Sequence, residues 1–208
     1  MALYVVGAGG TGRETLDVAM AAGVDVTAFV DERRAGSTVR GLPVVGSDQA
    51  PAGAGYVIGI ADAAARRRLA VLLDARGLVP ATLVHPRAVI GPETVVGSGC
   101  IVMAGAHVSS SVRLGAHVQV QYNATVGHDA VLADYVSVYP GANVAGAVHL
   151  DEDVTIGSNA AVLQNLRVGR GTFVGAGAVV TSDAGEGLVL VGVPARPQSG
   201  GTSPRAFG

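Results

Sequence analysis

The sequence predicts two architectures in one chain of 208 residues: a small α/β domain of the Rossmann-like βαβ type over residues 1–82, and an all-β parallel β-helix over residues 83–196. Three observations support this. Strand-like and helix-like segments alternate in the first part of the chain. An aliphatic residue then recurs at every sixth position from Val84 to Val180. Glycine, with 31 residues, far exceeds its usual share of about 7%. We expect residues 197–208 to form a flexible tail.

The first strand is expected at residues 3–6 (LYVV), because four apolar residues run directly into a glycine-rich turn. A helix is expected over residues 12–22. Two further strands are expected in VTAFVDE (26–32) and GYVIGIAD (55–62), and a second helix in AAARRRLAVLLDARG (63–77). This alternation of strands and helices indicates a small parallel sheet.

The pattern G-x-G-x-x-G at residues 7–12 lies between the first strand and the first helix. Such a turn lets backbone N–H groups face a phosphate, and an acidic residue ending the second strand suits a ribose hydroxyl. About eighty residues are too few for both halves of a dinucleotide-binding sheet, so a nucleotide-sugar or another mononucleotide-like ligand is favoured. The alternative is a turn that only packs helix against strand. The residues expected to contact the ligand are Gly9, Gly10, Thr11, Asp31 and Glu32.

A six-residue repeat dominates the rest of the chain. Helices repeat about every 3.6 residues and half-buried strands about every 2, so this period fits neither. It fits a solenoid in which each hexad is a short strand and a tight turn, and three hexads make one triangular coil with the aliphatic residue inside. The fifth residue of each hexad, Cys100 among them, should also face the core. The aliphatic positions are Val84, Ile90, Val96, Val102, Val108, Leu114, Val120, Val126, Leu132, Val138, Val144, Leu150, Ile156, Val162, Val168, Val174 and Val180.

The composition excludes several classes of function. The absence of lysine removes Schiff-base chemistry and a lysine-containing phosphate loop, and a single cysteine removes intrachain disulfides and cysteine metal clusters. A net charge of −2 without a basic block disfavours nucleic acid as a partner. No apolar run approaches the ~18 residues of a membrane span, and the first residues lack the basic region of a signal peptide. We therefore expect a cytoplasmic protein without membrane insertion.

The hexad pattern [LIV]-[GAED]-x-x-[STAV]-x resembles that of the left-handed β-helix acyltransferases, which implies left-handed coils. From residue 3 to about 196, a glycine-turn βαβ domain joined to such a helix resembles the sugar acetyltransferases of the UDP-4-amino-sugar N-acetyltransferase and sialic-acid O-acetyltransferase group. The resemblance implies that the small domain holds a nucleotide-amino-sugar and that acetyl-CoA lies along the helix. It also implies a homotrimer with active sites at subunit interfaces, and no metal.

The segment His128-Asp129-Ala130-Val131-Leu132 matches the catalytic signature of this group, and VGVPAR (191–196) resembles its closing, coenzyme-binding segment. Acetyl transfer from a thioester to an amine needs a base, and a histidine suits neutral pH. His128 takes the third hexad position, at a corner pointing away from the core, and Asp129 can stabilise the imidazolium. The alternative is a solvent-facing turn histidine. Along the coenzyme we expect Ser137, Gly146, Ser158, Gly175 and Ala176, with a backbone N–H near Gly146 as oxyanion donor.

Three positions depart from the group. Ser137 stands where relatives often carry a second histidine that meets the acetyl group, Thr11 replaces the histidine of a first-turn GHG, and Ala61, an expected substrate contact, replaces a glycine. We expect residues 66–68, three arginines, on a solvated helix face. Among the other histidines, His85 is expected to be structural. The three expected on the surface are His107, His117 and His149.

The sequence therefore predicts acetyl-CoA-dependent N-acetylation of a nucleotide-linked amino sugar. Sugar O-acetylation is the alternative within the same class. Two other classes stay open: a β-helix metal enzyme that binds zinc through three histidines, which would have to converge from different subunits, and a non-catalytic nucleotide-sugar binder.

Overall fold

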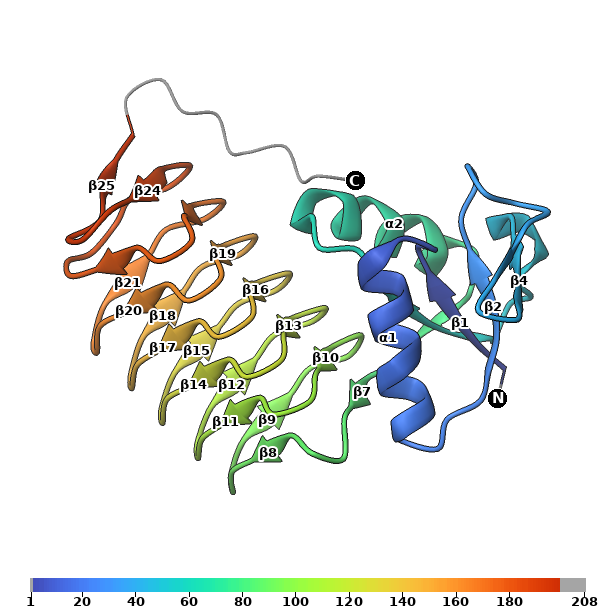
Figure 1. Ribbon diagram of the computed structural model, residues 1–208, viewed down its shortest axis with the longest axis horizontal. Helices are drawn as coiled ribbons and strands as arrows, with labels where there is room; N and C mark the ends of the chain where they lie inside the picture. Colours follow the sequence, from blue (N-terminus) through green and yellow to red (C-terminus); the bar gives the residue numbers. More distant parts are fainter. Residues whose placement is uncertain (1, 199–208) are drawn as a thin grey trace.

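The computed structural model describes residues 2–198, in which an N-terminal α/β unit stands beside one face of a triangular prism (Figure 1). The strands of the N-terminal sheet lie in the order β3-β4-β2-β1-β5-β6, and all neighbours are parallel except β3 and β4. The predicted parallel sheet is thus confirmed, with a short hairpin added. The elements of this unit are β1 (Leu3–Val6), α1 (Gly10–Ala21), β2 (Val26–Val30), β3 (Thr38–Val39), β4 (Leu42–Val45), a 3-10 turn (Ser47–Gln49), β5 (Gly55–Ile58), α2 (Ala63–Ala75) and β6 (Val79–Pro80).

Both faces of the N-terminal sheet are covered by apolar side chains, which is why its central strands read as unbroken hydrophobic runs. Alternate residues of each strand point to opposite faces. Val5 and Phe29 pack in one cluster with Leu16 of α1, whereas Tyr56 and Ile58 pack in another with α2. The unit is therefore a three-layer sandwich, helix on sheet on helix.

The prism is a left-handed parallel β-helix with three faces, named here in the order in which the chain visits them. The first face contains β7 (Leu83–Val84), β10 (Ile101–Val102), β13 (Gln119–Val120), β16 (Ser137–Val138), β19 (Thr155–Ile156), β22 (Phe173–Val174), β24 (Val189–Val191) and β25 (Arg196–Pro197). The second face contains β8 (Val89–Ile90), β11 (His107–Val108), β14 (Thr125–Val126), β17 (Asn143–Val144), β20 (Ala161–Val162) and β23 (Val179–Val180). The third face contains β9 (Val95–Val96), β12 (Arg113–Leu114), β15 (Val131–Leu132), β18 (His149–Leu150) and β21 (Arg167–Val168).

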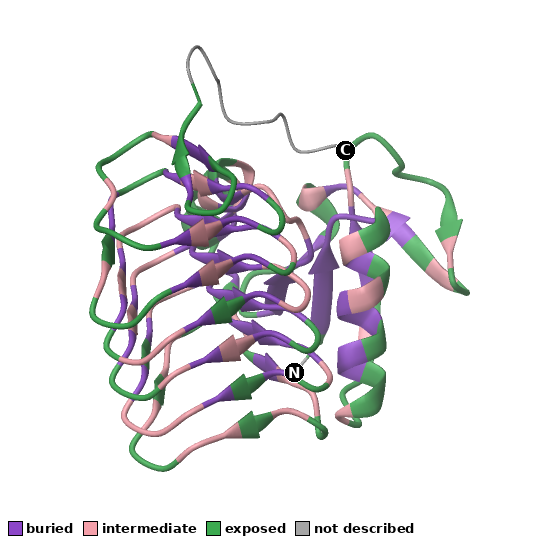
Figure 2. Ribbon diagram, turned by 60° about the vertical axis from the view of Figure 1, so that its left-hand side comes forward, coloured by how far each residue is buried: buried purple, intermediate pink, exposed green. Residues whose placement is uncertain are grey.

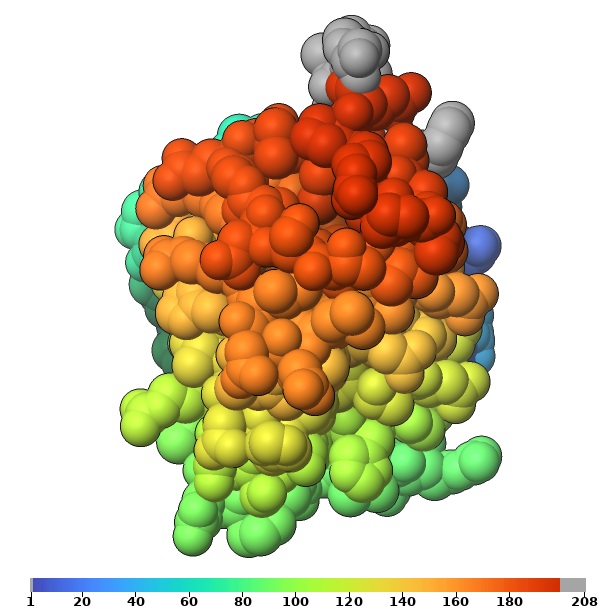
Figure 3. Space-filling model, turned by 90° about the vertical axis from the view of Figure 1, so that its left-hand side faces the viewer, coloured from blue at the N-terminus to red at the C-terminus, as the bar shows by residue number. Residues whose placement is uncertain are grey.

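As far as Val180, successive coils pair in a register of 18 residues, as where Ile101 pairs with Leu83 on one side and Gln119 on the other. This register stacks each inward aliphatic residue on its copy in the next coil. The repeat residues form one continuous core, which Figure 2 shows as buried strand segments inside the prism. Cys100 is buried in this core, as predicted. Figure 3 shows one side of the stack, with the colours following one another coil by coil.

The prism continues beyond the predicted end of the repeat at Val180. The last coil is two residues shorter, so Ala184 pairs with Val168 and Val189 pairs with Phe173 in a register of 16 residues. The six-residue repeat does not predict this coil, because the two-residue deletion shifts the positions of its inward-facing residues. Strand β25 then folds back antiparallel onto β24, which places Pro197 in a strand although we expected it in the tail. Residues 199–208 of the expected tail lie outside the described residues.

The N-terminal unit packs on the coils of the first face that come first in the sequence, and two sequence predictions fail there. His117 was expected on the surface, but its ring is only 3% exposed and is stacked between Tyr56 and Tyr135, at centroid distances of 5.9 and 5.2 Å. Arg66 was expected on a solvated helix face, but it is 1% exposed. Each residue contacts the other unit, His117 through the Tyr56 ring and Arg66 through Tyr135 and Ser137, and the sequence does not indicate these contacts.

The buried imidazole of His117 makes the contact between the units sensitive to pH. Burial lowers the pKa of His117 below its ordinary value near 6.5. In the unfolded chain it takes up a proton as the pH falls through about 6.5, whereas the folded chain takes it up only at lower pH. Below about pH 6.5 the unfolded state therefore binds more protons, and the free energy of unfolding falls as the pH falls.

We predict that His117→Asn removes this part of the acid sensitivity, because asparagine does not titrate and tolerates the positive φ of 56° at this position. Urea unfolding between pH 5 and 8 measures it. The wild type should lose up to about 1.4 kcal/mol per pH unit more than the variant between pH 6.5 and the pKa of folded His117. Parallel pH profiles for the two proteins would contradict the prediction, whatever their difference in absolute stability.

Candidate active site

The glycine turn opens at the carboxyl end of β1, between the neighbouring strands β2 and β5. Gly7 has a φ of +97°, and a Cβ there would lie 2.7 Å from Ile60 Cγ1. A Cβ on Gly12 would collide with the Gly7 carbonyl oxygen, and one on Gly59 would lie 2.6 Å from Gly12 Cα. Only glycine fits at these positions, because strand and helix meet backbone to backbone. This crevice is where open α/β sheets bind their ligands.

Gly9 and Gly10 lie at the N-terminus of α1 with open space where side chains would stand. Both are exposed, and the first turn of the helix contains no acidic residue. The helix N-terminus therefore presents unhindered N–H groups and the positive end of its dipole, which favour an anion. Thr11 is half-buried, and its carbonyl accepts a bond from Thr15 Oγ1 at 2.8 Å.

The acidic pair after β2 is held by backbone N–H groups. Asp31 accepts from Ala8 N at 3.0 Å and from Arg33 N at 3.1 Å, and Glu32 accepts from Ser47 N at 2.8 Å. The bond from Ser47 lowers the pKa of Glu32, so this carboxylate is charged at neutral pH. Each residue thus shapes a loop beside the glycine turn while presenting a carboxylate at its rim.

His128 stands in the turn between β14 and β15, at the corner joining the second and third faces. Its side chain is 67% exposed, and Nδ1 lies 2.7 Å from Asp129 Oδ2. A carboxylate can only accept, so Nδ1 carries the hydrogen and the neutral imidazole has a free lone pair on Nε2. Asp129 has a φ of 60°, a left-handed conformation that Asp tolerates and that the corner of each coil requires. The turn geometry thus prepares His128 as a proton acceptor.

Gly146 lies one coil above His128, and the imidazole covers it. A Cβ at Gly146 would lie 2.7 Å from His128 Nε2 and 2.8 Å from Cε1, so a side chain would displace the ring. Within residues 2–198 the Gly146 N–H has no hydrogen-bond partner, while its neighbour Ala147 donates to the His128 carbonyl at 2.8 Å. An unpartnered N–H beside the imidazole is what the predicted oxyanion donor requires.

The structure gives Ser137 and Ala61 roles that we did not predict. Ser137 is fully buried, and its hydroxyl accepts from Arg66 Nη2 at 2.8 Å, so the predicted contact with coenzyme A is unavailable on the surface of a single chain. The Ala61 carbonyl accepts from Arg66 Nη1 at 2.7 Å. The sequence offers no signal for Arg66 beyond its neighbours in an arginine triplet, because two of its partners, Tyr135 and Ser137, lie in the other unit.

The other residues predicted along the coenzyme lie at a different corner from His128. Ser158 follows β19 and Gly175 and Ala176 follow β22, all in turns between the first and second faces. Ala176 is exposed and Ser158 half-buried, whereas Gly175 is buried against Leu190 and Val191. Within one chain, the surface predicted to bind the coenzyme and the predicted base, His128, therefore lie at different corners.

The glycine turn is separated from His128 as well. The N-terminal unit packs on the first face, through contacts such as Gln119 Nε2 with the Ile58 carbonyl at 2.8 Å. His128 occupies the one corner of the prism that does not border the first face. Each part of the predicted site thus has a defined geometry, but the fold of a single chain does not bring these parts together.

Among residues 2–198, no three His, Cys, Asp or Glu side chains are grouped so that they could hold a metal ion. In the same part of the chain, no helix has the length and apolar character needed to cross a membrane.

Two family models match the chain in succession: the PglD N-terminal domain over residues 2–73 and the GlmU-like C-terminal hexapeptide over residues 79–184. A curated relative, GDP-perosamine N-acetyltransferase of Escherichia coli O157:H7, is 33% identical over 188 residues, with 85% of each chain covered.

Solved structures give the same result. Perosamine N-acetyltransferase from Caulobacter crescentus, with one histidine replaced by asparagine and with CoA and GDP-perosamine bound, superposes with a TM-score of 0.90 at 28% identity, covering 95% of this chain and 97% of that one. The acetyltransferase domain of PglB from Neisseria gonorrhoeae in complex with acetyl coenzyme A gives 0.86 at 34% identity, covering 95% and 98%.

The fold and the comparisons together define an acyltransferase of the left-handed β-helix class. Within that class, the chain belongs to the hexapeptide-repeat sugar N-acetyltransferases with a PglD-type N-terminal domain, as the sequence resemblance implied.

We predict that Gly146→Ala lowers turnover by about 10–100-fold, because the added methyl group displaces the His128 ring and a misplacement of about 1 Å at a reacting group can cost that much. The backbone at Gly146 is half-buried and its φ is negative, so the melting temperature should change little. Steady-state kinetics and thermal unfolding measure the two effects.

Gly185→Ala is the matched control, because the nearest atom to its added Cβ is Leu188 Cδ1 at 3.9 Å. It should keep wild-type turnover. Full activity of Gly146→Ala would show that the imidazole need not lie against this glycine.

Proposed function

We propose that this protein transfers the acetyl group of acetyl-CoA to the amino group of a nucleotide-linked amino sugar, with His128 as the general base. The observation that carries the proposal is the His128-Asp129 pair: a solvent-facing imidazole with Nδ1 fixed at 2.7 Å from a carboxylate and Nε2 free to accept a proton. The relatives named for GDP-perosamine support a GDP-linked amino sugar as the acceptor.

In the proposed reaction, the nitrogen lone pair of the sugar amine attacks the thioester carbonyl carbon. His128 Nε2 takes the amine proton, so the nitrogen is neutral in the tetrahedral intermediate, which becomes the amide when the thiolate leaves. The Gly146 N–H is placed to donate to the oxygen that becomes negative. The carbon–sulfur bond then breaks, and the protonated imidazole, stabilised by Asp129, returns the proton to the leaving thiolate.

We propose that the nucleotide diphosphate binds at the glycine turn. Its phosphates would meet the N–H groups of Gly9, Gly10 and Thr11, and Asp31 or Glu32 would lie beside the base or ribose. The open space at Gly9 and Gly10 and the helix dipole support this placement. Ala61 lies in the loop between β5 and α2.

We further propose a homotrimer whose active sites lie between subunits. The glycine turn is on the first-face side of the prism and His128 is at the opposite corner, so a substrate held by one chain would meet the base of another. The coenzyme residues Ser158 and Ala176 would then line the groove between two prisms. The boundary between substrate-binding and acyltransferase domains would fall near residue 82, between β6 and β7.

His128→Ala should lower turnover by about 10²–10⁴-fold, the usual cost of losing a general base. Folding and coenzyme binding should be nearly unchanged, because the side chain points away from the core. Acetyl transfer from acetyl-CoA to GDP-, UDP- and dTDP-linked amino sugars measures the effect and identifies the acceptor. Near-wild-type turnover would remove His128 from the mechanism.

Two variants accompany this test. Asp129→Asn should cost less than His128→Ala, because the amide keeps the turn but loses the charge. His107→Ala is the matched control, since His107 is also an exposed histidine on the prism and should tolerate replacement. His117 does not serve as a control, because its replacement would disturb the contact between the two units.

The interface proposal predicts complementation between two inactive variants. Gly9→Asp should fold, because nothing lies within 4 Å of its Cβ, and its carboxylate should repel the diphosphate. Refolding it together with His128→Ala should restore measurable turnover, since mixed trimers contain some sites with both residues intact. Turnover no higher than that of the separate variants would place both residues in one subunit's site, and sedimentation as a monomer would exclude the trimer.

A further inference from the structure

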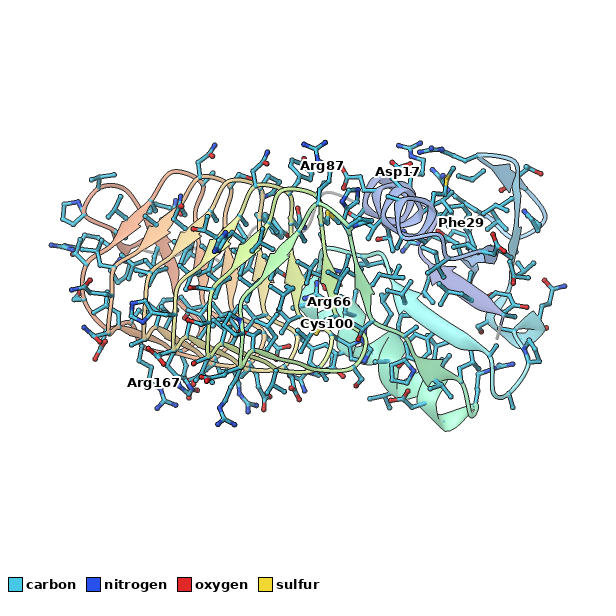
Figure 4. The ribbon with its side chains drawn as sticks, turned by 90° about the horizontal axis from the view of Figure 1, so that it is seen from below. Asp17, Phe29, Arg66, Arg87, Cys100 and Arg167 are labelled. Atoms are coloured by element: carbon cyan, nitrogen blue, oxygen red, sulfur yellow. The ribbon has the colours of Figure 1, made fainter. Side chains whose placement is uncertain are left out.

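A cluster of buried polar side chains joins the N-terminal unit to the prism. Its centre is Arg66 of α2, which Figure 4 shows between the two units. Nη1 donates to the carbonyls of Ile60 at 3.0 Å and Ala61 at 2.7 Å. Nη2 donates to the Tyr135 carbonyl at 2.6 Å and the Ser137 hydroxyl at 2.8 Å. One guanidinium therefore ties the loop after β5 to the coil that follows His128.

Stability alone is a poor reason for this arrangement. All hydrogen-bond partners of Arg66 within the described residues are neutral, and burial lowers the pKa of the guanidinium to about 10, so it is still charged at neutral pH. A buried charge costs free energy, and an apolar side chain of similar volume often stabilises a protein as well or better. What an apolar side chain cannot supply is a rigid, directional connection between four acceptors.

A second connection between the two units is made to the same loop. Gln119, from β13 on the first face, is 1% exposed, and its Nε2 donates to the carbonyls of Ile58 at 2.8 Å and Ile60 at 3.2 Å. The loop of residues 59–61 is thus bonded to the prism from two elements, β13 and β16.

The same loop is in direct contact with the glycine turn. Gly7 approaches Ile60, and Gly59 lies against Gly12, so closely that neither glycine has room for a Cβ. A displacement of residues 59–61 would therefore move the turn at residues 7–12. Direct contacts therefore connect the prism to the glycine turn through Arg66 and the loop of residues 59–61.

We propose that Arg66 is a positioning residue for the acetyl transfer: it fixes the loop of residues 59–61, and with it the glycine turn, at a set position relative to the prism. The inference rests on the proposed function, because it assigns the turn to the amino-sugar substrate and the prism to the base. Arg66 touches no reacting atom, and it acts by holding the two substrate-binding surfaces in a fixed relation.

Arg66→Lys tests the proposal, because lysine keeps the charge and the stem but cannot bridge acceptors on both units. We expect kcat for the nucleotide amino sugar to fall by about 10–100-fold, as for a displaced reactant. The KM for acetyl-CoA should stay within about twofold, because the groove between prisms is untouched. Hydrogen–deuterium exchange at residues 7–12 and 58–62 should become at least about tenfold faster. Gln119→Met, which removes the second connection while conserving volume, should give the same pattern more weakly.

Arg67→Met is the matched control. Arg67 also joins α2 to the prism, through Glu152 at 3.0 Å, Asp153 at 2.9 Å and the Tyr135 ring, but it makes no bond to residues 59–61. It is partly exposed, so its loss should lower the melting temperature slightly and leave kcat and the exchange of the two segments at wild-type values.

The outcomes separate this inference from the proposed function. Wild-type kcat and exchange in a folded Arg66→Lys protein, or equal losses in Arg67→Met, would overturn the positioning role. If Arg66→Lys does not fold, Gln119→Met decides by the same two readouts. If the wild type acetylates no nucleotide amino sugar, the proposed function fails. Exchange alone then decides whether Arg66 fixes the loop, and unchanged exchange overturns the inference.

Discussion

The hydrogen-bonded register of 18 residues between coils is the constraint on which the rest of the molecule depends. It stacks every inward aliphatic residue on its copy in the next coil, and these residues build the core together with the fifth residue of each hexad. It also places corner residues in columns, and this is why Gly146 lies over His128. A register error of one residue would turn the aliphatic side chains outward and separate that pair. Core packing and site geometry therefore have the same cause.

The second structural determinant is the contact between the N-terminal unit and the first face. On an isolated prism, the outward positions Gln119 and Ser137 would be ordinary surface residues, and His117 would be a corner residue. The contact buries all three and gives Arg66 and Tyr56 their partners. The two units therefore meet around a polar junction, and in the proposed function this junction would orient a nucleotide-sugar bound to the first unit relative to the second.

The fold separates the tasks that acetyl transfer requires. The glycine turn lies in the N-terminal unit, whereas His128 and the turns predicted to line the coenzyme stand at different corners of the prism. On the proposed function, a prism with parts of a site at two of its corners suits assembly around a threefold axis, where each groove would combine corners of two copies.

The sequence by itself determined the architecture and singled out His128 as the proposed base. Periodicity fixed the prism because every hexad obeys the same local rule, and the motifs at residues 7–12 and 128–132 carry their geometry in adjacent residues, where turn conformation decides it. Only the tertiary structure decided that Arg66, His117 and Ser137 are buried. Each has at least one partner far away in the sequence and in the other unit, as where Arg66 bonds Ser137 and His117 stacks on Tyr56, and burial by such a partner leaves no periodic trace in the sequence. The last coil was not predicted for a related reason. It is two residues shorter than the others, and only its pairing with the coil before it shows that it belongs to the prism.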